Sequence, residues 1–545
     1  MTKADGFPSG VTVNLNDVGL STVLSNQTTL IAKGYLAPWT TGKASFSLSA
    51  PSGWSTNVLV PVAAVAVPYD AAQRLAMQVA FGPRTDTIAR IQQLGMAAYL
   101  KEQVSQPADV YPSPDAEQPQ THFLRLVGSG PAVLRQRTAW AFQTFIPESG
   151  FPNPSSMITW ETTLERDAFG SFKQILLDAA SVPIIGYQLN LTGNYASTDP
   201  NVHPNQNFAR ELMQLFSLGT VLLNEDGTPN LDASGKEQPV YDQDTVLAMS
   251  RVFTGWNLST VIVHPDIVQG SYDFSQPLVA DENYHDHGSK LLFGHVLLPA
   301  GQSAALDRDQ ALEAIFQHPN LPPFVCRILI QRFVKSQPSP AYVKRIVQVF
   351  KDNGTGVRGD LGSVLQAILL DPEARLEDTT STLSDGFVQD PLFAQIVVMH
   401  LMNVVLYDDT PIYHPRDLGE PWWRSPSVFS YFRPSYVVPG TSINSPESQL
   451  LDDIRIVQRS QFIWTVLTQN GLGSIAGFGT NPIYLQFPTL TSLTEALNHE
   501  LYHGAMPQHV KDAIASYCGG ISDHTLQLQS AVFIALSSDY YTVTQ

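Results

Sequence analysis

The stretch NQNFARELMQLFSLG, Asn205 to Gly219, combines the apolar periodicity of a helix with an unusual stripe of polar side chains. We expect this helix to begin at Pro204 and Asn205 and to end at Gly219. Residues at i, i+3, i+4 and i+7 share one face of a helix, so polar and apolar residues fall on opposite sides. Such a stripe is either a solvated surface or a polar network. The stripe consists of Asn207, Arg210, Glu211 and Gln214, and the apolar side of Phe208, Leu212, Leu215 and Phe216.

The composition indicates a folded, acidic protein. With 545 residues the chain is long enough for two or three domains, and a hydrophobic content of 43% is ample for a large buried core. The formal net charge of −18 would repel nucleic acid and anionic membrane surfaces, and no basic run compensates for it. We therefore expect neither nucleic acid nor an anionic membrane surface as the main partner.

Cysteine usage and hydropathy exclude two further classes of protein. The two cysteines, Cys326 and Cys518, lie far apart and form no CxxC pattern, so neither a disulfide framework nor a thiolate metal site is indicated. A single bridge between them stays open. The longest apolar run, Val58 to Val67, is about half the length that spans a bilayer, and we expect no transmembrane segment.

The pattern of the chain changes near residue 66. Residues 11–66 carry alternating or continuous apolar segments rich in β-branched residues, which predicts a small β-rich module over residues 1–66. From Pro68 onward helical periodicity dominates, so the expected fold class is mainly α, with long loops. The clearest expected helices are residues 70–80, 85–104, 131–145, 171–183, 244–253, 309–317, 324–334, 341–353, 360–370 and 391–407.

The segment Asn205 to Gly219 resembles the signature of the bacterial domain-of-unknown-function 1800 family, whose usual form is close to PNENFARELMELFTLG. In that family a tyrosine, an acidic pair and ARALTGW follow, then HDxGxK and a Leu-Gly pair. The same order stands here. The first set is Tyr241, Asp242, Asp244 and RVFTGW, Arg251 to Trp256; the second is His285, Asp286, Gly288, Lys290 and Phe293-Gly294.

Later segments are also similar to this family, so that the resemblance covers about residue 67 to the end. They are residues 318–343, 356–375 and 425–436 and the closing ALSSDYY. The resemblance implies one large, irregular helical domain over residues 67–545, with a subdivision near 385–390 as the alternative. Ahead of it, Gly34-Tyr35-Leu36-Ala37-Pro38 is similar to the last strands of the immunoglobulin-like domain found in some family members.

The resemblance implies a location and a partner, but no activity. Members of the family are commonly exported, which implies a periplasmic, cell-surface or extracellular protein. The chain begins MTKADGFPSG, which lacks the apolar core of a signal peptide, so we expect that a signal has been removed or the chain truncated. Genes of the family often neighbour those of an exported sulfatase-like family, and this implies a sulfatase-like protein or another envelope component as a partner.

The resemblance also highlights polar residues that suit a divalent metal or an anionic ligand. Carboxylates, imidazole and amides are hard to borderline metal ligands, while arginine and lysine hold anionic groups. Alternatively, such a set is a buried structural network that fixes helices to loops. For a metal-assisted hydrolase, the resemblance implies catalysis by Glu211, His285 and Asp286 and binding by Asn205, Asn207, Arg210, Asp242, Asp244 and Lys290.

This chain departs from the family at several of its common polar positions. Phe142 and Thr144 stand where two histidines of FWHNHF are frequent, and Gln206 replaces the glutamate of Asn-Glu-Asn. Tyr187-Gln188-Leu189-Asn190 replaces Tyr-Leu-Asp-Asn. If the common family site binds a metal through those groups, this member has lost the site or rebuilt it. The departures favour the structural network.

A separate catalytic pattern, HELYH, runs from His499 to His503. Histidines at i and i+4 of a helix face one way and can bind zinc, while Glu500 acts as general base on the metal-bound water. His509 has the spacing of the third metzincin ligand. However, Met506 replaces the turn glycine of those peptidases, and no methionine follows to form a Met-turn.

Three functional hypotheses follow. The first is an exported binding or assembly protein whose polar constellation is structural, and the missing histidines favour it. The second is a metal-assisted hydrolase that uses Glu211 and His285. The third is a zinc metallopeptidase that uses His499, Glu500 and His503.

Overall fold

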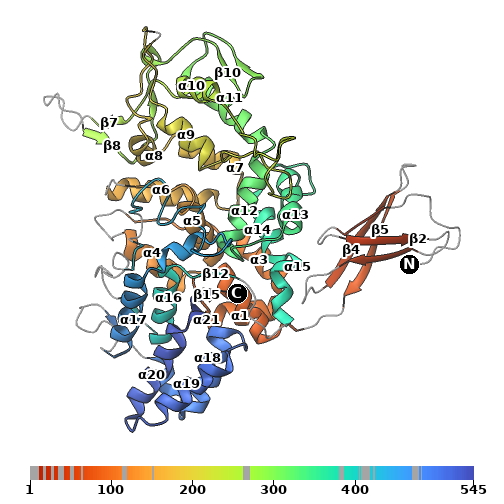
Figure 1. Cartoon of the computed structure of the whole chain (residues 1–545), viewed down its shortest axis with the longest axis vertical. Helices are drawn as coiled ribbons and strands as arrows, with labels where there is room; N and C mark the ends of the chain where they lie inside the picture. The colour runs from red at the N-terminus through yellow and green to blue at the C-terminus, as the bar shows by residue number, and fades with distance from the viewer. Residues whose placement is uncertain are drawn as a thin grey trace.

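The computed structural model describes most of the helical part of the chain and short strands ahead of it. The described residues are 12–15, 20–25, 30–34, 42–49, 55–62, 66–112, 119–149, 153–199, 201–261, 271–379, 386–403, 405–406, 418–420, 424–468, 478–479 and 482–544. Helices dominate among them, and the protein is mainly α, as the helical periodicity predicts (Figure 1).

The helices follow one another with short strands between some of them. The first are α1 (Tyr69–Val79), α2 (Thr85–Leu94), α3 (Met96–Ser105), α4 (Pro119–Ser129), α5 (Val133–Gln143), α6 (Pro154–Asp167), α7 (Phe172–Ala179) and α8 (Pro183–Gln188). The next are α9 (Asn207–Gln214), α10 (Gln243–Val252), α11 (Ala304–Gln317), α12 (Leu321–Phe333), α13 (Pro340–Lys351), α14 (Leu361–Leu370) and α15 (Pro372–Arg375). The last are α16 (Pro391–Met402), α17 (Asp453–Thr468), α18 (Leu490–Tyr502), α19 (Gln508–Cys518), α20 (His524–Ser537) and α21 (Asp539–Thr542).

The strands of the helical body form small antiparallel pairs. These are β6 (Trp256–Asn257) with β9 (Val279–Ala280), β7 (Ser259–Val261) with β8 (Ser271–Asp273), and β10 (Lys290–Leu292) with β11 (Val296–Leu298). The others are β12 (Phe387–Val388) with β15 (Val543–Thr544), and β13 (Val405–Leu406) with β14 (Phe478–Gly479). The β12–β15 pair places the end of the described chain beside residues that precede α16.

Five strands lie within residues 1–66. The strand order β1-β4-β5 forms one antiparallel sheet from Thr12–Leu15, Gly42–Ser49 and Ser55–Val62. Strands β2 (Leu20–Ser25) and β3 (Leu30–Gly34) form a second antiparallel pair. Residues 35–38 of the immunoglobulin-like match lie outside the described residues, so that likeness stays a prediction.

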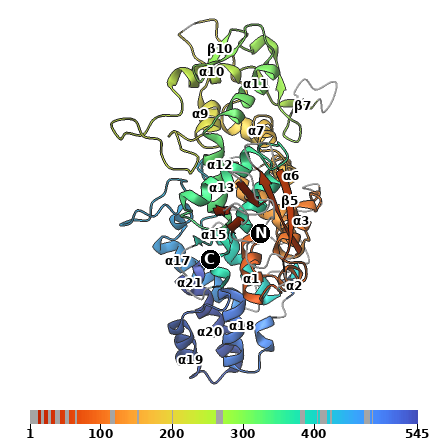
Figure 2. The same cartoon turned by 90° about the vertical axis from the view of Figure 1, so that its right-hand side faces the viewer.

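The helical body is elongated. Helices α8 to α11, with β7 to β11, form one end, and α17 to α20 form the other (Figures 1 and 2). Helices α1 and α12 lie between these ends in both views, and α5 and α16 lie between them in Figure 1. The polar stripe of α9 and the HELYH segment of α18 are therefore at opposite ends of the body.

Helix α16, PLFAQIVVMHLM, holds the middle and the lower end of the body together. It carries no aspartate, glutamate, lysine or arginine, and every residue from Pro391 to Met399 is buried. A helix that is apolar on all sides belongs in the interior. It ends at Asn403, which adopts a left-handed conformation with φ of 47°, and it is therefore shorter than the expected helix over 391–407.

Two buried carboxylates satisfy the first turn of α16. Asp390 accepts the backbone N–H of Phe393 at 3.1 Å and the indole N–H of Trp140 at 3.1 Å. Glu420 accepts the backbone N–H of Leu392 at 3.1 Å. These bonds compensate N–H groups that have no partner within the helix, which is what allows the start of α16 to be buried.

The core consists of three clusters of buried apolar side chains. One spans α1 to α14, a second spans α16 to α21, and a third joins α4, α5 and α6 to α16. Val397 of α16 belongs to the second cluster and Phe393 to the third. A subdivision near residues 385–390 stays a prediction, because α16 packs into clusters on both sides of it.

The described part of the chain contains no helix that is long and apolar enough to cross a membrane. Both cysteines are free and buried, so Cys326 and Cys518 form no disulfide with each other. The expected single helix over 85–104 is divided at Gly95, whose φ of 82° ends α2 and precedes α3. Glycine tolerates this backbone conformation at low cost.

Candidate functional site

Helix α9 is shorter than the expected helix from Asn205 to Gly219. Asn205 precedes it, and its side-chain oxygen accepts the backbone N–H of Asn207 at 2.9 Å. Beyond the last helical residue, the N–H groups of Phe216 and Leu218 bond to carbonyls five residues back, at 3.0 and 2.8 Å. These wider turns break the α-helical pattern, so the prediction of a helix up to Gly219 is wrong.

The polar stripe of α9, expected to be a buried structural network, is half-buried and makes local contacts. Arg210 donates to the side-chain oxygens of Gln206 at 2.8 Å and Gln243 at 2.9 Å. One carboxylate oxygen of Glu211 is shielded from solvent and makes no hydrogen bond with the described residues. Burial raises the pKa of Glu211, and Arg210 opposes this shift.

Asp242 and Asp244 belong to the start of α10. Asp242 caps the helix, because its carboxylate accepts the backbone N–H of Thr245 at 2.8 Å and the hydroxyl of the same residue at 2.7 Å. These two bonds lower the pKa of Asp242. Asp244 is exposed in the first turn, where a negative charge favours the helix. Both aspartates therefore have a structural role.

A closed ion network lies at the other end of α10, around Asp307 of α11. The Nε2 atom of His285 is 3.0 Å from the Asp307 carboxylate, and its Nδ1 atom is 3.0 Å from the backbone carbonyl of Thr254. The Lys290 ammonium and the Gln302 amide also donate to this carboxylate, each at 2.5 Å. Both ring nitrogens of His285 are therefore within hydrogen-bonding distance of neighbouring groups of the protein.

The Asp307 carboxylate is the anchor of this network. Burial would raise its pKa, but hydrogen bonds from His285, Lys290 and Gln302 outweigh burial and lower the pKa below its usual value. The side chains of Asp307 and His285 have no solvent exposure, and that of Lys290 is 1% exposed. Asp307 is far from His285 and Lys290 in the sequence, and no local pattern marks it.

Asp286 is held by a second ion pair. Its carboxylate accepts two parallel hydrogen bonds from Arg251, at 2.7 and 2.9 Å, and the backbone N–H of Gly288 at 2.8 Å. The Thr254 hydroxyl accepts the backbone N–H of Asp286 at 2.8 Å. Arg251 and Thr254 belong to the RVFTGW segment, which therefore positions the loop that carries His285.

Helix α10 separates the expected constellation into two sets. Arg210 contacts Gln243 at its start, whereas Asp286 contacts Arg251 at its end, about 12 Å further along at 1.5 Å per residue. A general base needs a nitrogen or carboxylate that is free to take a proton. Both nitrogens of His285 are engaged in this arrangement, and the contacts of the second set lock the loop that carries His285 onto α10 and α11.

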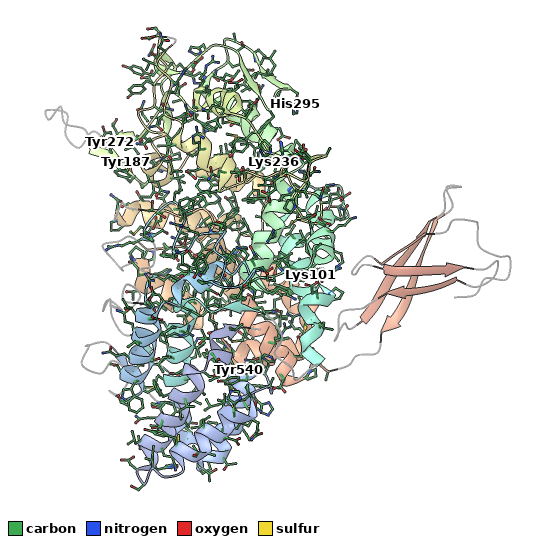
Figure 3. The ribbon with its side chains drawn as sticks, viewed as in Figure 1. Lys101, Tyr187, Lys236, Tyr272, His295 and Tyr540 are labelled. Carbon is green, nitrogen blue, oxygen red and sulfur yellow. The ribbon has the colours of Figure 1, made fainter. Side chains whose placement is uncertain are left out.

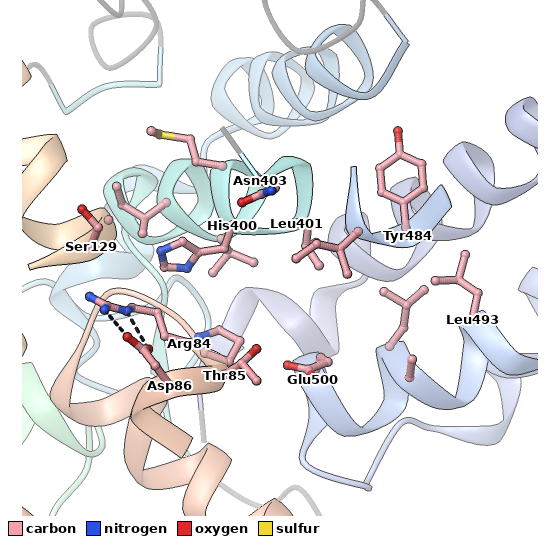
Figure 4. Close-up of a pocket in the computed structure, with 18 of the residues that line it drawn as sticks. Arg84, Thr85, Asp86, Ser129, His400, Leu401, Asn403, Tyr484, Leu493 and Glu500 are labelled. Atoms are coloured by element: carbon pink, nitrogen blue, oxygen red, sulfur yellow. Dashed lines mark hydrogen bonds and ion pairs between the residues drawn. The ribbon is translucent and has the colours of Figure 1, made fainter. Parts of the chain in front are cut away.

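A cavity of about 720 Å³ lies at the lower end of the body, between α2, α4, α16 and α18 (Figure 4). Its size falls in the range of small-molecule sites. Much of the lining is apolar and includes Leu124, Ile396, Leu401, Tyr484, Leu493 and Leu497. Polar groups gather around Arg84, Asp86, Ser129 and His400, whereas Tyr484 and Leu493 lie at the other side of the space (Figure 4).

Two features define the polar side of the cavity. Arg84 and Asp86 form a bidentate pair, with N–O distances of 3.0 and 2.5 Å. Burial and the nearby Arg84 guanidinium lower the pKa of His400 to about 4, so the imidazole is neutral at neutral pH. His400 is one of two polar residues within α16, and this interruption of an apolar helix is the sequence signal that marks the cavity.

Residues 74–543 match the family described as protein of unknown function, DUF1800. The chain belongs to the DUF1800 family. No curated protein and no solved structure matches it significantly. The match confirms the resemblance that began with the α9 stripe, and it covers almost the whole helical body.

The positions at which this DUF1800 protein departs from the family pattern are occupied by packing and backbone contacts. Phe142 is fully buried in the core, and the Thr144 hydroxyl donates to the carbonyl of Ala141 at 2.9 Å. Gln188 donates to the carbonyl of Pro147 at 2.7 Å and accepts the N–H of Ser149. Gln188 therefore ties α8 to the segment that follows α5.

The HELYH segment of the DUF1800 protein fixes α18 to α1. His499 Nδ1 lies 2.7 Å from the carboxylate of Asp70, and the hydroxyl of Tyr69 donates to the carboxylate of Glu500. The Gln73 amide donates to the backbone carbonyl of Glu500 at 2.6 Å. His499 and Glu500 therefore connect α18 to α1.

His503 and His509, the two remaining histidines of that pattern, do not continue the helix face that carries His499. His503 ends α18 in a left-handed conformation with φ of 40°, and burial, with Arg74 nearby, lowers its pKa to about 3. His509 packs against Tyr540, with 5.2 Å between ring centroids. Among the residues that the structure describes, no group of three or more His, Cys, Asp or Glu side chains is placed to hold a metal ion.

Three buried glutamates were not predicted from the sequence. Glu148, Glu161 and Glu165 are 2%, 1% and 0% exposed, and the last two lie one turn apart on α6. The carboxyl oxygens of Glu148 and Glu161 make no hydrogen bond with described residues. Burial raises the pKa of Glu161 well above its usual value, and Glu165 and Glu148 raise it further. Charged residues are rarely buried, so periodicity alone places them at the surface.

The pKa of Glu165, on the same helix, is also raised. Burial raises its pKa to about 7, and a hydrogen bond from Gln136 opposes the shift. A carboxyl group whose pKa is raised on folding stabilises the folded protein while it is protonated. This contribution to the free energy of unfolding is lost at a pH where the group ionises in the folded state. The cluster therefore favours the folded state below pH 4.5, the ordinary pKa of glutamate, and loses this advantage as the pH rises through about 7.

Replacing Asp307 tests the ion lock. We expect Asp307→Ala to lower the free energy of unfolding by about 3–5 kcal/mol, because the Lys290 ammonium stays buried without its ion-pair partner and His285 loses a hydrogen bond. The matched control is Asp309→Ala on the same helix, whose side chain is 53% exposed and which should cost about 1 kcal/mol or less. Urea unfolding followed by circular dichroism measures both. Equal losses in the two variants would contradict the lock.

Replacing Glu165 tests the buried carboxyl cluster. We expect Glu165→Gln to raise the melting temperature by about 2 °C or more at pH 8 and to leave it unchanged at pH 4.5, since glutamine never ionises. Glu495→Gln, whose side chain is 56% exposed, is the control and should show no such pH dependence. A gain that is independent of pH would exclude ionisation of Glu165 as its cause.

Proposed function

We propose that this DUF1800 protein is an exported binding protein that holds an amphipathic ligand in the cavity between α16 and α18. The observation that carries the proposal is the cavity itself, whose lining is largely apolar, with Arg84, Asp86, Ser129 and His400 gathered on one side (Figure 4). Sites for small molecules are concave and apolar, with a few polar groups that fix orientation. This arrangement suits a molecule with an apolar body and a polar head.

The ion pairs made by the polar residues around α10 support ligand binding over hydrolysis. His285, Asp286 and Lys290 are each engaged in ion pairs with Asp307 or Arg251. Glu211 lies near the opposite end of α10 from these residues. A hydrolytic site made of Glu211 and His285 would first require this lock to open, whereas ligand binding in the cavity requires no such change.

The position of α16 gives the cavity walls a fixed shape. Ile396 and Val397 line the cavity, and their neighbours Phe393 and Val398 are packed in the third and second core clusters. A wall formed by a fully packed helix is pre-formed, which reduces the ordering cost of binding. Binding therefore needs no folding of the α16 wall.

Location and partners follow from the family. Export is the expectation for members of this family, and the small number of lysines fits it. We propose a periplasmic, cell-surface or extracellular location, an immunoglobulin-like N-terminal module and an exported sulfatase-like protein or another envelope component as partner. In this proposal the protein supplies a ligand or an attachment point to that partner.

Filling the cavity tests the proposed function. Ala496 of α18 is half-buried and lines the cavity, so Ala496→Trp should place a large ring in it without disturbing the core. We expect the variant to bind the neutral dye N-phenyl-1-naphthylamine about tenfold more weakly, measured by fluorescence titration of the full chain. Ala513→Trp on the exposed face of α19 is the matched control and should bind as the parent does. Undiminished binding by Ala496→Trp, or no binding by the parent, would overturn the proposal.

A further inference from the structure

Charged side chains that line the cavity are already engaged with other groups of the protein. The guanidinium of Arg84 donates two hydrogen bonds to Asp86, and its third nitrogen donates to the carbonyl of Gly130 at 2.9 Å. The carboxylate of Glu500, which also lines the cavity, accepts the hydroxyl of Tyr69. A ligand therefore meets an existing ion pair and a hydrogen-bonded carboxylate.

The formal charges of the described lining residues cancel. Arg84 and Arg125 contribute two positive charges, and Asp86 and Glu500 contribute two negative charges, which leaves zero. An ionic head group that enters this space loses water without gaining a net opposite charge, and such burial is costly. An uncharged head group avoids that cost.

His400 brings a donor and an acceptor to the wall of the cavity. Both of its ring nitrogens are shielded from solvent and neither makes a hydrogen bond of good geometry with the described residues, although the backbone of Gly128 lies near enough to raise the pKa of His400 slightly against the effect of burial. The ring lines the cavity from the otherwise apolar helix α16 (Figure 4). A rotation of the ring by 180° about its Cβ–Cγ bond exchanges the nitrogens with the carbons opposite them. The preferred angles of this torsion are broad and roughly two-fold.

A neutral imidazole has one donor and one acceptor. The complementary group on a ligand is one that accepts and donates at the same time, such as a hydroxyl or a primary or secondary amide. A carboxylate only accepts, and a quaternary ammonium does neither. The chemistry of His400 and the balance of charge therefore select the same kind of head group.

We propose that the cavity selects an uncharged amphiphile, in which an aliphatic chain lies against Tyr484 and Leu493 and a hydroxyl or amide head reaches His400. This inference rests on the proposed function, because it specifies the ligand of the same cavity. The chain contributes affinity through burial, and the head contributes orientation and selectivity. Each additional methylene group that is buried should tighten binding about fourfold.

The test compares amphiphiles of equal chain length and different head charge. Decanol, decanoate and decyltrimethylammonium are tested as competitors that displace N-phenyl-1-naphthylamine from the full chain at pH 7.5, with decanol kept below its solubility limit and the two ions below their critical micelle concentrations. We expect decanol to bind about tenfold more tightly than either ion. Equal or tighter binding of an ion would overturn the selectivity while leaving the binding function in place. Failure of the dye and of all three amphiphiles to bind would overturn both.

Two variants assign the selectivity to named groups. His400→Phe keeps the ring and removes its nitrogens, so decanol should lose about tenfold in affinity while the dye binds as before. Asp86→Asn leaves Arg84 without its counter-charge, so decanoate should bind about threefold more tightly. Because the Asp86 side chain is 67% exposed, this variant tests the charge balance even if His400→Phe does not fold.

The matched controls lie outside the cavity. Asp512→Asn removes an exposed carboxylate from α19 and should leave the affinity order unchanged. Tyr272→Phe removes a hydroxyl at the opposite end of the body, where Tyr272 is 63% exposed beside Tyr187 (Figure 3). If either control changed the preference for decanol as much as His400→Phe does, the head-group site would not be at His400.

Discussion

The burial of α16 on all sides is the constraint on which the rest of the structure depends. A helix without an ionised side chain must be covered completely, so three core clusters form around it or against its neighbours. Its first turn requires buried acceptors, which Asp390 and Glu420 provide. Its last turn contains His400, the polar group that this environment keeps neutral. The cavity is where the covering of α16 is incomplete.

The segments of the family signature lie around α10, away from α16, and have a different role. The α9 stripe, RVFTGW and the His285 loop meet around α10, where Arg251 and Asp307 hold the loop through ion pairs. Burying such pairs contributes little net stability compared with apolar packing, but it fixes one arrangement of the loop. The sequence motif that identifies the family therefore describes how this end is held together, while the ligand site that we propose lies at the other end.

Much of the fold was predictable, but less of the site was. The apolar periodicity of α12, α13 and α16 predicts those helices, because each has a continuous buried face. It does not predict α6, where Glu161 and Glu165 occupy buried positions that a pattern analysis takes for surface. The Asp307 network joins residues 17 to 22 positions apart, which local sequence cannot reveal, and the place of the Arg84–Asp86 pair beside α16 depends on how α2 packs against that helix. The HELYH pattern does not reveal that its second histidine ends α18 in a left-handed conformation.

The most direct test of the central claim, that ligands bind beside α16 and not beside α10, is hydrogen–deuterium exchange of the full chain with and without decanol. Ligand contact slows local opening and hence amide exchange. The account predicts slower exchange in α18 and the last turn of α16, with no change in α9, α10 or β10. Slower exchange confined to α9 and α10 would contradict it and would place the functional site at the family signature.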